Sequence, residues 1–166
     1  MGDYNIAFSF LMDDEDRRRS GVVTDEPNGG KARFGINSIA HPEVPPAFYQ
    51  ADAESALEYA KSFYFTDYWT QIAGSLILDQ DVANKYLDLA VNMGVPQTTK
   101  LVQRAAGVND DGIPGPQTLK AINASVADVL LAGIRAGAAK FYQDLYNSNP
   151  EKYANDVKGW LVRAKR

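Results

Sequence analysis

The spacing of apolar residues predicts helices over most of the chain. Near its start, four apolar residues recur at helical intervals: Ile6, Ala7, Phe10 and Leu11. This pattern predicts a first helix over about residues 4–17. Residues 20–37 hold four glycines and one proline, a composition typical of a structured loop or a short hairpin.

The same periodicity predicts further helices over about residues 52–65, 81–93, 97–107, 116–123, 125–147 and 151–164. Asp52 is placed to cap the first of these helices, and Gly94 to end the second. Ser125 with Asp128 resembles a capping box at the start of the long helix. Strand signals are weak. The sequence therefore predicts a compact, all-α domain with a small glycine-rich loop or hairpin after the first helix.

The composition excludes several classes of protein. With 17 basic and 21 acidic residues, the net charge is -4, which argues against a nucleic-acid binder held by phosphate contacts. The chain has no cysteine and one histidine, so disulfides, thiolate nucleophiles and transition-metal sites are not expected. No segment approaches the roughly 20 apolar residues of a membrane span. We expect a monomer without metal or organic cofactor that inserts in no membrane.

One carboxylate differs from the others in the charged cluster at the end of the first predicted helix. Ala7, Leu11 and Glu15 are spaced four apart, so Glu15 continues the apolar stripe as the helix leaves the core. The nearby acids Asp13, Asp14 and Asp16 are expected to point elsewhere. A carboxyl at the edge of an apolar face is partly desolvated, which suits it to donate a proton near neutral pH. The alternative is an ordinary solvated helix end.

A glycosidase commonly needs a second carboxylate, which activates water or attacks the sugar. Asp25 and Glu26 lie in the loop after the first helix and are the candidates for that role. The alternative is an ordinary turn, Asp-Glu-Pro-Asn-Gly. The glycines of the same loop permit a close approach of the backbone to a ligand.

The stretch E-D-R-R-R-S-G-V-V-T-D-E-P-N-G-G-K-A-R-F-G-I-N, from Glu15 to Asn37, resembles the signature of glycoside hydrolase family 108. Members of that family are phage-type N-acetylmuramidases with a lysozyme-like helical fold. Their catalytic glutamate ends the first helix and precedes a glycine-rich loop that closes on Gly-Ile. Similar segments follow in order: D-Y-W at 67–69, Y-L-D-L-A-V-N-M-G at 86–94, D-G-I-P-G-P-Q-T-L at 111–119 and G-W-L-V-R at 159–163.

The resemblance covers nearly the whole chain and implies one lysozyme-like domain. Residues 1–94 would form its catalytic part, with Glu15 as the acid, and residues 95–166 a helical part that resembles a peptidoglycan-binding region. Many members carry Glu-Gly-Gly-Tyr where this chain has Glu15-Asp16-Arg17-Arg18. The resemblance therefore supports Glu15 and leaves its partner carboxylate open.

Substrate contacts are expected at six residues within or next to the matched motifs: Arg33, Phe34, Asn37, Tyr68, Trp69 and Asn92. Core packing is the alternative for the aromatic residues Tyr68 and Trp69. Asp88 and Asn92 lie one turn apart on the face of their helix opposite much of its apolar stripe, where ordinary polar helix residues are the alternative.

The implied activity is hydrolysis of the β-1,4 bond between N-acetylmuramic acid and N-acetylglucosamine in bacterial peptidoglycan. Inverting and retaining mechanisms stay open, as does a lytic transglycosylase that cuts the same bond. Two alternatives are not enzymes: a peptidoglycan-binding module and a helical interaction protein. The apolar run at 6–12 lacks the features of a secretory signal, so we expect synthesis in the cytoplasm and action on the cell wall after release or export.

Overall fold

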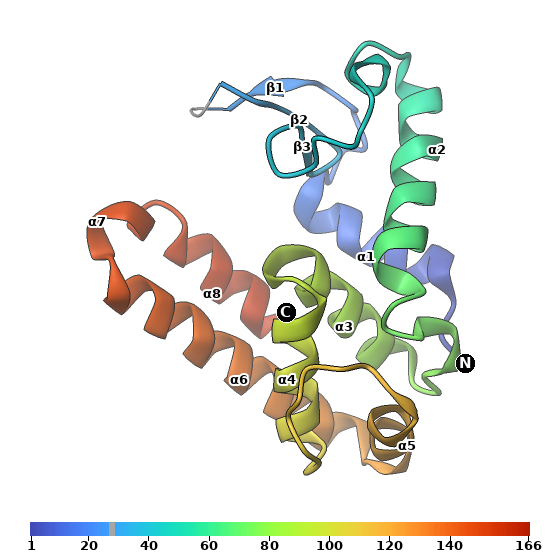
Figure 1. Ribbon diagram of the computed structural model, residues 1–166, viewed down its shortest axis with the longest axis vertical. Helices are drawn as coiled ribbons and strands as arrows, with labels where there is room; N and C mark the ends of the chain where they lie inside the picture. Colours follow the sequence, from blue (N-terminus) through green and yellow to red (C-terminus); the bar gives the residue numbers. More distant parts are fainter. Residues whose placement is uncertain (27–28) are drawn as a thin grey trace.

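A computed structural model describes residues 1–26 and 29–166, and it is mostly helical (Figure 1). The helices are α1 (Tyr4–Glu15), α2 (Ala53–Tyr64), α3 (Gln80–Met93), α4 (Val95–Ala105), α5 (Pro116–Ala124), α6 (Ala127–Ser148), α7 (Pro150–Tyr153) and α8 (Val157–Lys165). Shorter helical segments are the 3₁₀ turns η1 (Pro46–Tyr49) and η3 (Gly74–Leu76) and the π-helical turn η2 (Phe65–Trp69). The predicted fold class, helical with one small hairpin region, is confirmed.

The helix α3 forms the centre of the fold, where α1, α4 and α6 pack against it. Every residue from Val82 to Ala90 is buried, including the polar Asn84, Lys85 and Asp88. The sequence places Asp88 on a face opposite the apolar stripe, but its exposed fraction is 0%. The alternative of an ordinary, solvent-exposed polar helix residue therefore does not hold for Asp88, because neighbouring helices cover α3 on more than one side.

The helix α1 carries the first candidate residue to the edge of this core. Asp3 caps its start by accepting hydrogen bonds from two backbone N–H groups. Its buried residues are Ala7, Phe8, Leu11 and Met12. The helix ends at Glu15, where the chain turns away at Asp16 with φ -155°. Glu15 therefore lies one turn beyond the buried Leu11, as the spacing predicts.

A three-stranded antiparallel sheet follows, in the order β1 (Thr24–Asp25), β2 (Lys31–Arg33) and β3 (Ile36–Asn37). Arg33 pairs with Ile36, so Phe34 and Gly35 form a two-residue turn. Both residues have positive φ, 48° and 79°, the backbone shape that tight hairpins favour. The predicted hairpin region is thus confirmed as a small sheet over the end of α1.

Two predicted caps of the helices are confirmed, and a third is wrong. Asp52 accepts a hydrogen bond from Ser55 N at 2.9 Å, and Gly94 ends α3 with φ 85°. The predicted capping box at Ser125 does not form. Ser125 Oγ donates instead to Ala121 O at 2.8 Å, because Ser125 ends α5, and Val126 is the N-cap of α6.

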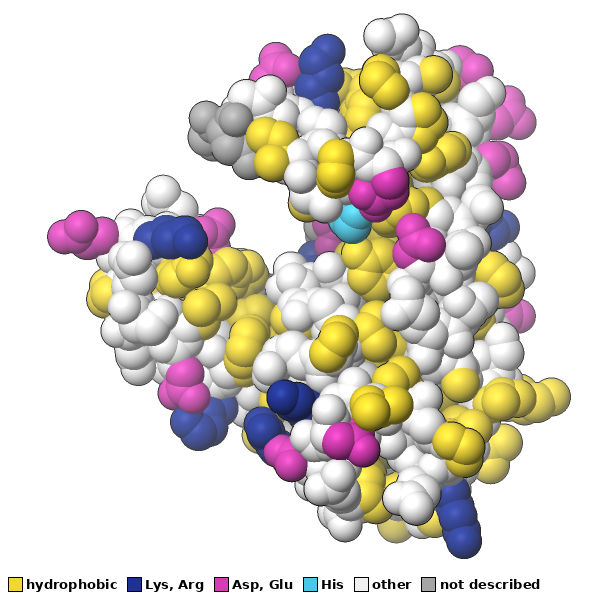
Figure 2. All heavy atoms as spheres, viewed as in Figure 1, with side chains coloured by type: hydrophobic (Ala, Val, Ile, Leu, Met, Phe, Trp, Pro, Cys, Tyr) yellow, Lys and Arg dark blue, Asp and Glu magenta, His cyan; other side chains and the backbone are white. Residues whose placement is uncertain are grey.

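The C-terminal helices form an arm that faces the sheet. α6 packs against α4 and α8, and the predicted last helix over 151–164 is divided into α7 and α8. Figure 1 shows the sheet and α2 at one end of the molecule and α6 to α8 projecting to one side. Figure 2 shows the surface hollowed between the arm and the sheet.

Within the described residues, no single helix is both long and apolar enough to cross a membrane; α5 and α6 meet these two conditions only as a pair, across a 119° bend.

Candidate active site

A pocket of about 410 Å³ lies between the end of α1 and the sheet. Its wall is formed by Glu15, Asp16, Ser20, Val22, Thr24, Glu26, Ala32, Arg33, Phe34, Gly35 and Asn37. The predicted acid and several of the predicted contacts therefore meet in one cavity. They meet because the chain reverses after α1 and returns over its C-terminal end as β1, β2 and β3.

The turn at Gly35 holds the Glu15 carboxyl group closely. A Cβ atom at Gly35 would lie 2.5 Å from Glu15 Oε2 and 2.8 Å from the Tyr64 hydroxyl oxygen. Only glycine therefore fits here, for reasons of space as well as of its positive φ. The Tyr64 hydroxyl donates to Phe34 O at 2.9 Å and fixes the same turn to α2. Burial, and secondarily the charge of Glu15, raises the pKa of Tyr64, so this hydroxyl stays a donor.

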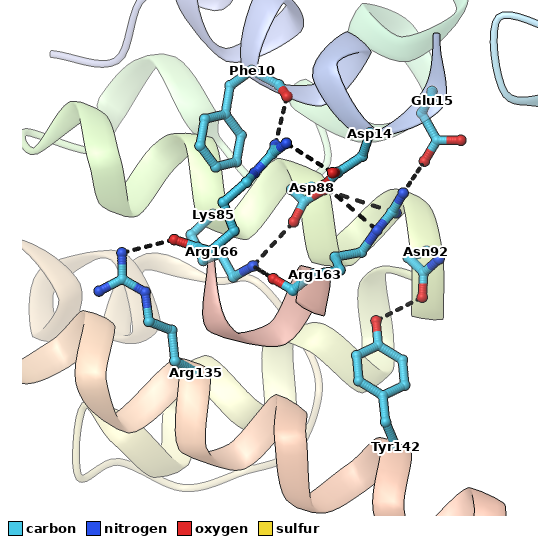
Figure 3. A network of polar contacts seen from close by, with 10 residues as sticks. All are labelled: Phe10, Asp14, Glu15, Lys85, Asp88, Asn92, Arg135, Tyr142, Arg163 and Arg166. Carbon is cyan, nitrogen blue, oxygen red and sulfur yellow. Dashed lines mark hydrogen bonds and ion pairs between the residues drawn. The ribbon is translucent and has the colours of Figure 1, made fainter. Parts of the chain in front are cut away.

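The other oxygen of Glu15 is bound from the far end of the chain. Arg163 Nη2, in α8, donates to Glu15 Oε1 at 2.6 Å (Figure 3). The two side chains are 11% and 16% exposed, so the contact is largely shielded from water. Burial alone lowers the pKa of Arg163, but the carboxylates of Glu15, Asp88 and Asp14 together raise it above its ordinary value. Arg163 is therefore a fixed positive charge beside Glu15.

Arg163 belongs to a buried charge network beneath the site (Figure 3). Lys85 Nζ donates to Asp88 Oδ2 at 3.1 Å and also to Arg163 O. Arg163 Nη1 lies 3.8 Å from Asp88 Oδ1, and neither atom has a hydrogen-bond partner among the described residues. Burial raises the pKa of Asp88, although the positive charges of Arg163 and Lys85 partly offset this shift. Burial lowers the pKa of Lys85, and the negative charge of Asp88 partly offsets that shift.

The two candidates for the second carboxylate lie on different faces of the loop. Glu26 lines the pocket together with Thr24, whereas Asp25 is exposed and does not line it. This follows from the alternation of side chains along an extended strand. The structure therefore brings Glu26, and not Asp25, into the same cavity as Glu15.

A third carboxylate in the pocket, Asp16, was not expected there. The sequence places Asp16 on another face of the first helix. In the structure α1 ends at Glu15, so Asp16 follows the helix and lines the pocket. Its Oδ2 accepts a hydrogen bond from Gly21 N at 2.8 Å, and Ser20 Oγ donates to the same carboxylate at 3.3 Å. These bonds show that Asp16 closes the loop at 16–21.

Three predicted contact residues form the wall of the pocket. Arg33 is buried, and its guanidinium donates to Gly21 O at 2.7 Å and to Phe48 O and Ala51 O at 2.8 Å. Phe34 is 2% exposed. Asn37 Oδ1 accepts hydrogen bonds from two backbone N–H groups of the loop after β3. These contacts show that Arg33 and Asn37 shape the pocket from behind.

Trp69, a predicted substrate contact, lies outside the residues that line the pocket. Its side chain is 1% exposed, its Nε1 donates to Ser75 Oγ at 2.9 Å, and its ring packs closely against Gly74. A ring enclosed in this way has no surface to offer a sugar. Tyr68 is half-buried against Phe63 and Tyr64 and lies outside the residues that line the pocket.

Asn92 lies in a second pocket, on the α8 side of Arg163. Its Oδ1 accepts a hydrogen bond from the Tyr142 hydroxyl at 2.6 Å. The structure thus places Asn92 near Glu15 but not in the same pocket. Arg163 itself was not predicted as a site residue, although it ends the G-W-L-V-R motif. Its contact with Glu15 could not be inferred from the sequence, because it depends on α8 lying beside the end of α1.

No group of three or more His, Cys, Asp or Glu side chains is placed to hold a metal ion among residues 1–26 and 29–166.

Comparison with known proteins gives two family matches that follow one another along the chain. The family model described as glycosyl hydrolase 108 matches residues 17–94, and the one described as "Predicted Peptidoglycan domain" matches residues 97–165. The first match begins two residues after Glu15, so the role of Glu15 depends on its position and geometry. No curated protein matches the sequence.

Among solved structures, the chain is similar to SagA of Brucella abortus. The TM-score is 0.68 at 24% sequence identity, over 97% of this chain and 92% of that chain. This likeness confirms the predicted lysozyme-like, mostly helical fold over nearly the whole length.

Proposed function

We propose that the chain is a peptidoglycan hydrolase of the N-acetylmuramidase type with Glu15 as its general acid, because residues 17–94 match glycosyl hydrolase 108 and residues 97–165 match a predicted peptidoglycan domain. The bond cut is the β-1,4 linkage between N-acetylmuramic acid and N-acetylglucosamine. The observation that carries the proposal is the position of Glu15, held between Gly35 and Arg163 at the wall of a pocket.

The geometry supports a division of work between the two oxygens of Glu15. Arg163 binds Oε1, which leaves Oε2, beside Gly35, to carry the proton. That proton passes to the glycosidic oxygen as the bond to the sugar breaks. The fixed guanidinium then stabilises the carboxylate that remains after proton transfer.

We propose Glu26 as the second carboxylate, in place of the pair of candidates that the sequence left open. It shares the pocket with Glu15, and its backbone forms hydrogen bonds with Gly29 and Gly30. Its charge would stabilise the positive, oxocarbenium-like sugar or activate a water molecule. Asp16 is the weaker candidate because its oxygens already close the loop at 16–21.

We further propose that the chain acts as one domain, with its catalytic part in residues 1–94 and a helical part in residues 95–166. The two matched segments support this division, since they meet near Gly94, which separates α3 from α4. The contact between Arg163 and Glu15 supports a single unit, because the second part completes the surroundings of the acid.

The experiment is digestion of purified peptidoglycan by the wild type and by Glu15→Gln, with products identified by mass spectrometry. Gln keeps the shape but has no proton to donate, so activity should fall by a factor on the order of 100 or more. Asp13→Asn is the matched control: Asp13 lies on the same helix end and pairs with the exposed Arg19, outside the pocket.

The products decide between the alternatives. Reducing muramic acid ends from the wild type and from Asp13→Asn, but not from folded Glu15→Gln, support the proposal. Full activity of Glu15→Gln contradicts the role of Glu15. Anhydro-muramic ends indicate a lytic transglycosylase, and sedimentation with the wall without any cleavage indicates a binding module.

A further inference from the structure

A second pocket, of about 630 Å³, lies on the α8 side of Glu15. Its lining residues are Asp14, Asn92, Asn155, Asp156, Lys158, Gly159, Trp160, Val162 and Arg163. Most of them come from the segment 155–163, in the part of the chain that matches the predicted peptidoglycan domain. The arm that carries this segment borders the hollow seen in Figure 2.

The second pocket lies beside the first one, on the other side of the contact between Glu15 and Arg163. Arg163 lines the second pocket, and its Nη2 binds Oε1 of Glu15, which lines the first. Asp14, the residue before Glu15, lies in the second pocket as well. A chain of sugars bound across both pockets therefore passes over the carboxyl group of Glu15.

The side chains of the second pocket suit an N-acetylated sugar. Trp160 offers part of an aromatic ring whose position is fixed by stacking on Tyr142, with centroids 5.4 Å apart and planes at 23°. An amphipathic ring of this kind packs on the apolar face of a sugar. Asn92, held by the Tyr142 hydroxyl, and the neighbouring Asn155 supply amide groups to the same wall.

The charges of the two pockets differ in a way that orients the substrate. The first pocket holds Glu15, Asp16 and Glu26, and its one basic residue, Arg33, is directed at backbone carbonyls. Its negative charge suits the sugar that becomes positive during cleavage. The leaving-group side of the strand then extends into the second pocket.

The second pocket suits the anionic part of peptidoglycan better than the first. Its lining holds two acids, Asp14 and Asp156, and two basic residues, Lys158 and Arg163, whereas the first pocket has three acids and one basic residue. Asp14 pairs with Arg166 at 2.8 Å, and Lys158 has no ion-pair partner in the part of the chain that the structure describes. Lys158 is exposed and lines the pocket. An exposed ammonium group attracts the carboxylates of the stem peptide on muramic acid.

We propose that this second pocket binds the leaving-group side of the glycan strand: the N-acetylglucosamine unit next to the cut bond and the peptide-bearing muramic acid beyond it. The inference rests on the proposed function, since it takes Glu15 as the acid. The C-terminal part of the chain is then a subsite of the active site, and not a separate anchor to the wall.

Gly159→Leu tests the proposal because it fills the pocket from α8. A Cβ atom at Gly159 meets nothing within 4 Å, so the new side chain extends into open space and the helix gains a better helix former. Ala136→Leu is the control, an exposed position of α6 that lines neither pocket. Gly159→Leu should raise KM for glycan strands by about tenfold or more, because the leucine occupies space that the sugar needs, and Ala136→Leu should leave KM unchanged.

Binding is then measured by calorimetry in the Glu15→Gln background, with peptide-bearing glycan strands and with an N-acetylglucosamine tetramer as probes. Lys158→Ala should weaken binding of the peptide-bearing strands and leave binding of the tetramer unchanged, and added salt should remove the difference. Gly159→Leu should weaken the binding of both probes.

Three outcomes overturn the inference. Gly159→Leu could have the same KM and the same binding as the wild type, or it could change KM no more than Ala136→Leu does. Lys158→Ala could weaken the binding of both probes equally. Failure of the proposed function is a separate result, because it requires that the wild type release no reducing muramic acid ends. If the wild type cuts peptidoglycan and Gly159→Leu cuts it equally well, only the proposal for the second pocket is contradicted.

Discussion

Arg163 donates a hydrogen bond to Glu15 across 148 positions of sequence, at 2.6 Å. The proposed acid and its partner thus lie in different parts of the chain: Glu15 precedes the segment that matches glycosyl hydrolase 108, and Arg163 lies in the segment that matches the predicted peptidoglycan domain. The C-terminal part therefore contributes directly to the surroundings of the proposed acid.

Replacing Arg163 should impair catalysis by changing the position and charge environment of Glu15. In Arg163→Gln we expect kcat to fall by about 10- to 100-fold, since a displacement of about 1 Å at a reacting group has effects of that size. The kcat–pH profile should also move, because the variant lacks a fixed positive charge beside the acid. Arg163→Lys keeps the charge and should recover part of kcat. An unchanged pH profile with only a higher KM would contradict a positioning role.

Gly35→Ala should reduce activity through a direct clash with Glu15. The added Cβ atom would lie 2.5 Å from Oε2, so the carboxyl group or the turn must move. Gly107→Ala is a matched control: its φ is 72°, against 79° for Gly35, and nothing lies within 4 Å of its Cβ atom. Both variants should lose roughly 1–2 kcal/mol of stability from the left-handed backbone, measured by urea unfolding.

Only Gly35→Ala should lose peptidoglycan cleavage beyond this loss of stability. Equal activity of the two folded variants would show that the close approach of Gly35 to Glu15 has no part in catalysis.

Lys85→Met should destabilise the fold because it leaves Asp88 without its closest positive charge. Both side chains are at most 1% exposed, and losing one partner of such a pair costs about 3–5 kcal/mol. The double variant Lys85→Met, Asp88→Leu should recover much of that loss in urea unfolding. No recovery would show that the hydrogen bond of Lys85 to the backbone, and not the ion pair, matters.

The loss in Lys85→Met should also depend on pH. Burial raises the folded-state pKa of Asp88 above the ordinary value of 3.8, so the folded state then favours the protonated carboxyl group. Destabilisation should be small below pH 3.8 and should grow as the pH rises through the raised pKa, because ionised Asp88 must then stay buried. Thermal unfolding as a function of pH measures this dependence.

Asp52 should contribute a stabilisation that acid removes. Its hydrogen bonds to Ser55 lower its folded-state pKa below the ordinary value of 3.8. The contribution is therefore fully present above pH 3.8 and is lost as the pH falls through the lowered pKa. Asp52→Ala should lower Tm at neutral pH and differ less from the wild type in acid. Asp52→Asn, an uncharged cap, should show no such dependence on pH.

Features that depend on neighbours in sequence could be read from the sequence. The spacing of Ala7, Leu11 and Glu15 indicated that the acid ends a helix at the edge of the core, because a helix places every fourth residue on one face. The caps at Asp52 and Gly94 follow from hydrogen bonds and backbone shapes within one turn. These predictions required no knowledge of the rest of the fold.

Local sequence patterns did not predict the features that depend on how the helices pack against one another. The burial of Asp88 and of Trp69 depends on which helices cover them, and a periodic pattern does not contain that information. Ser125 has the right neighbours for a capping box but ends the preceding helix instead. The choice of Glu26 over Asp25 depends on which face of a short strand is turned towards α1.

The sequence by itself thus determined the helices, the hairpin region, the family resemblance and the candidate acid Glu15. The tertiary structure alone decided that Arg163 binds Glu15 and that a second pocket adjoins the first. The physical reason is distance along the chain. Local hydrogen bonding and side-chain periodicity act over a few residues, whereas a hydrogen bond across 148 positions exists only when the whole core has packed.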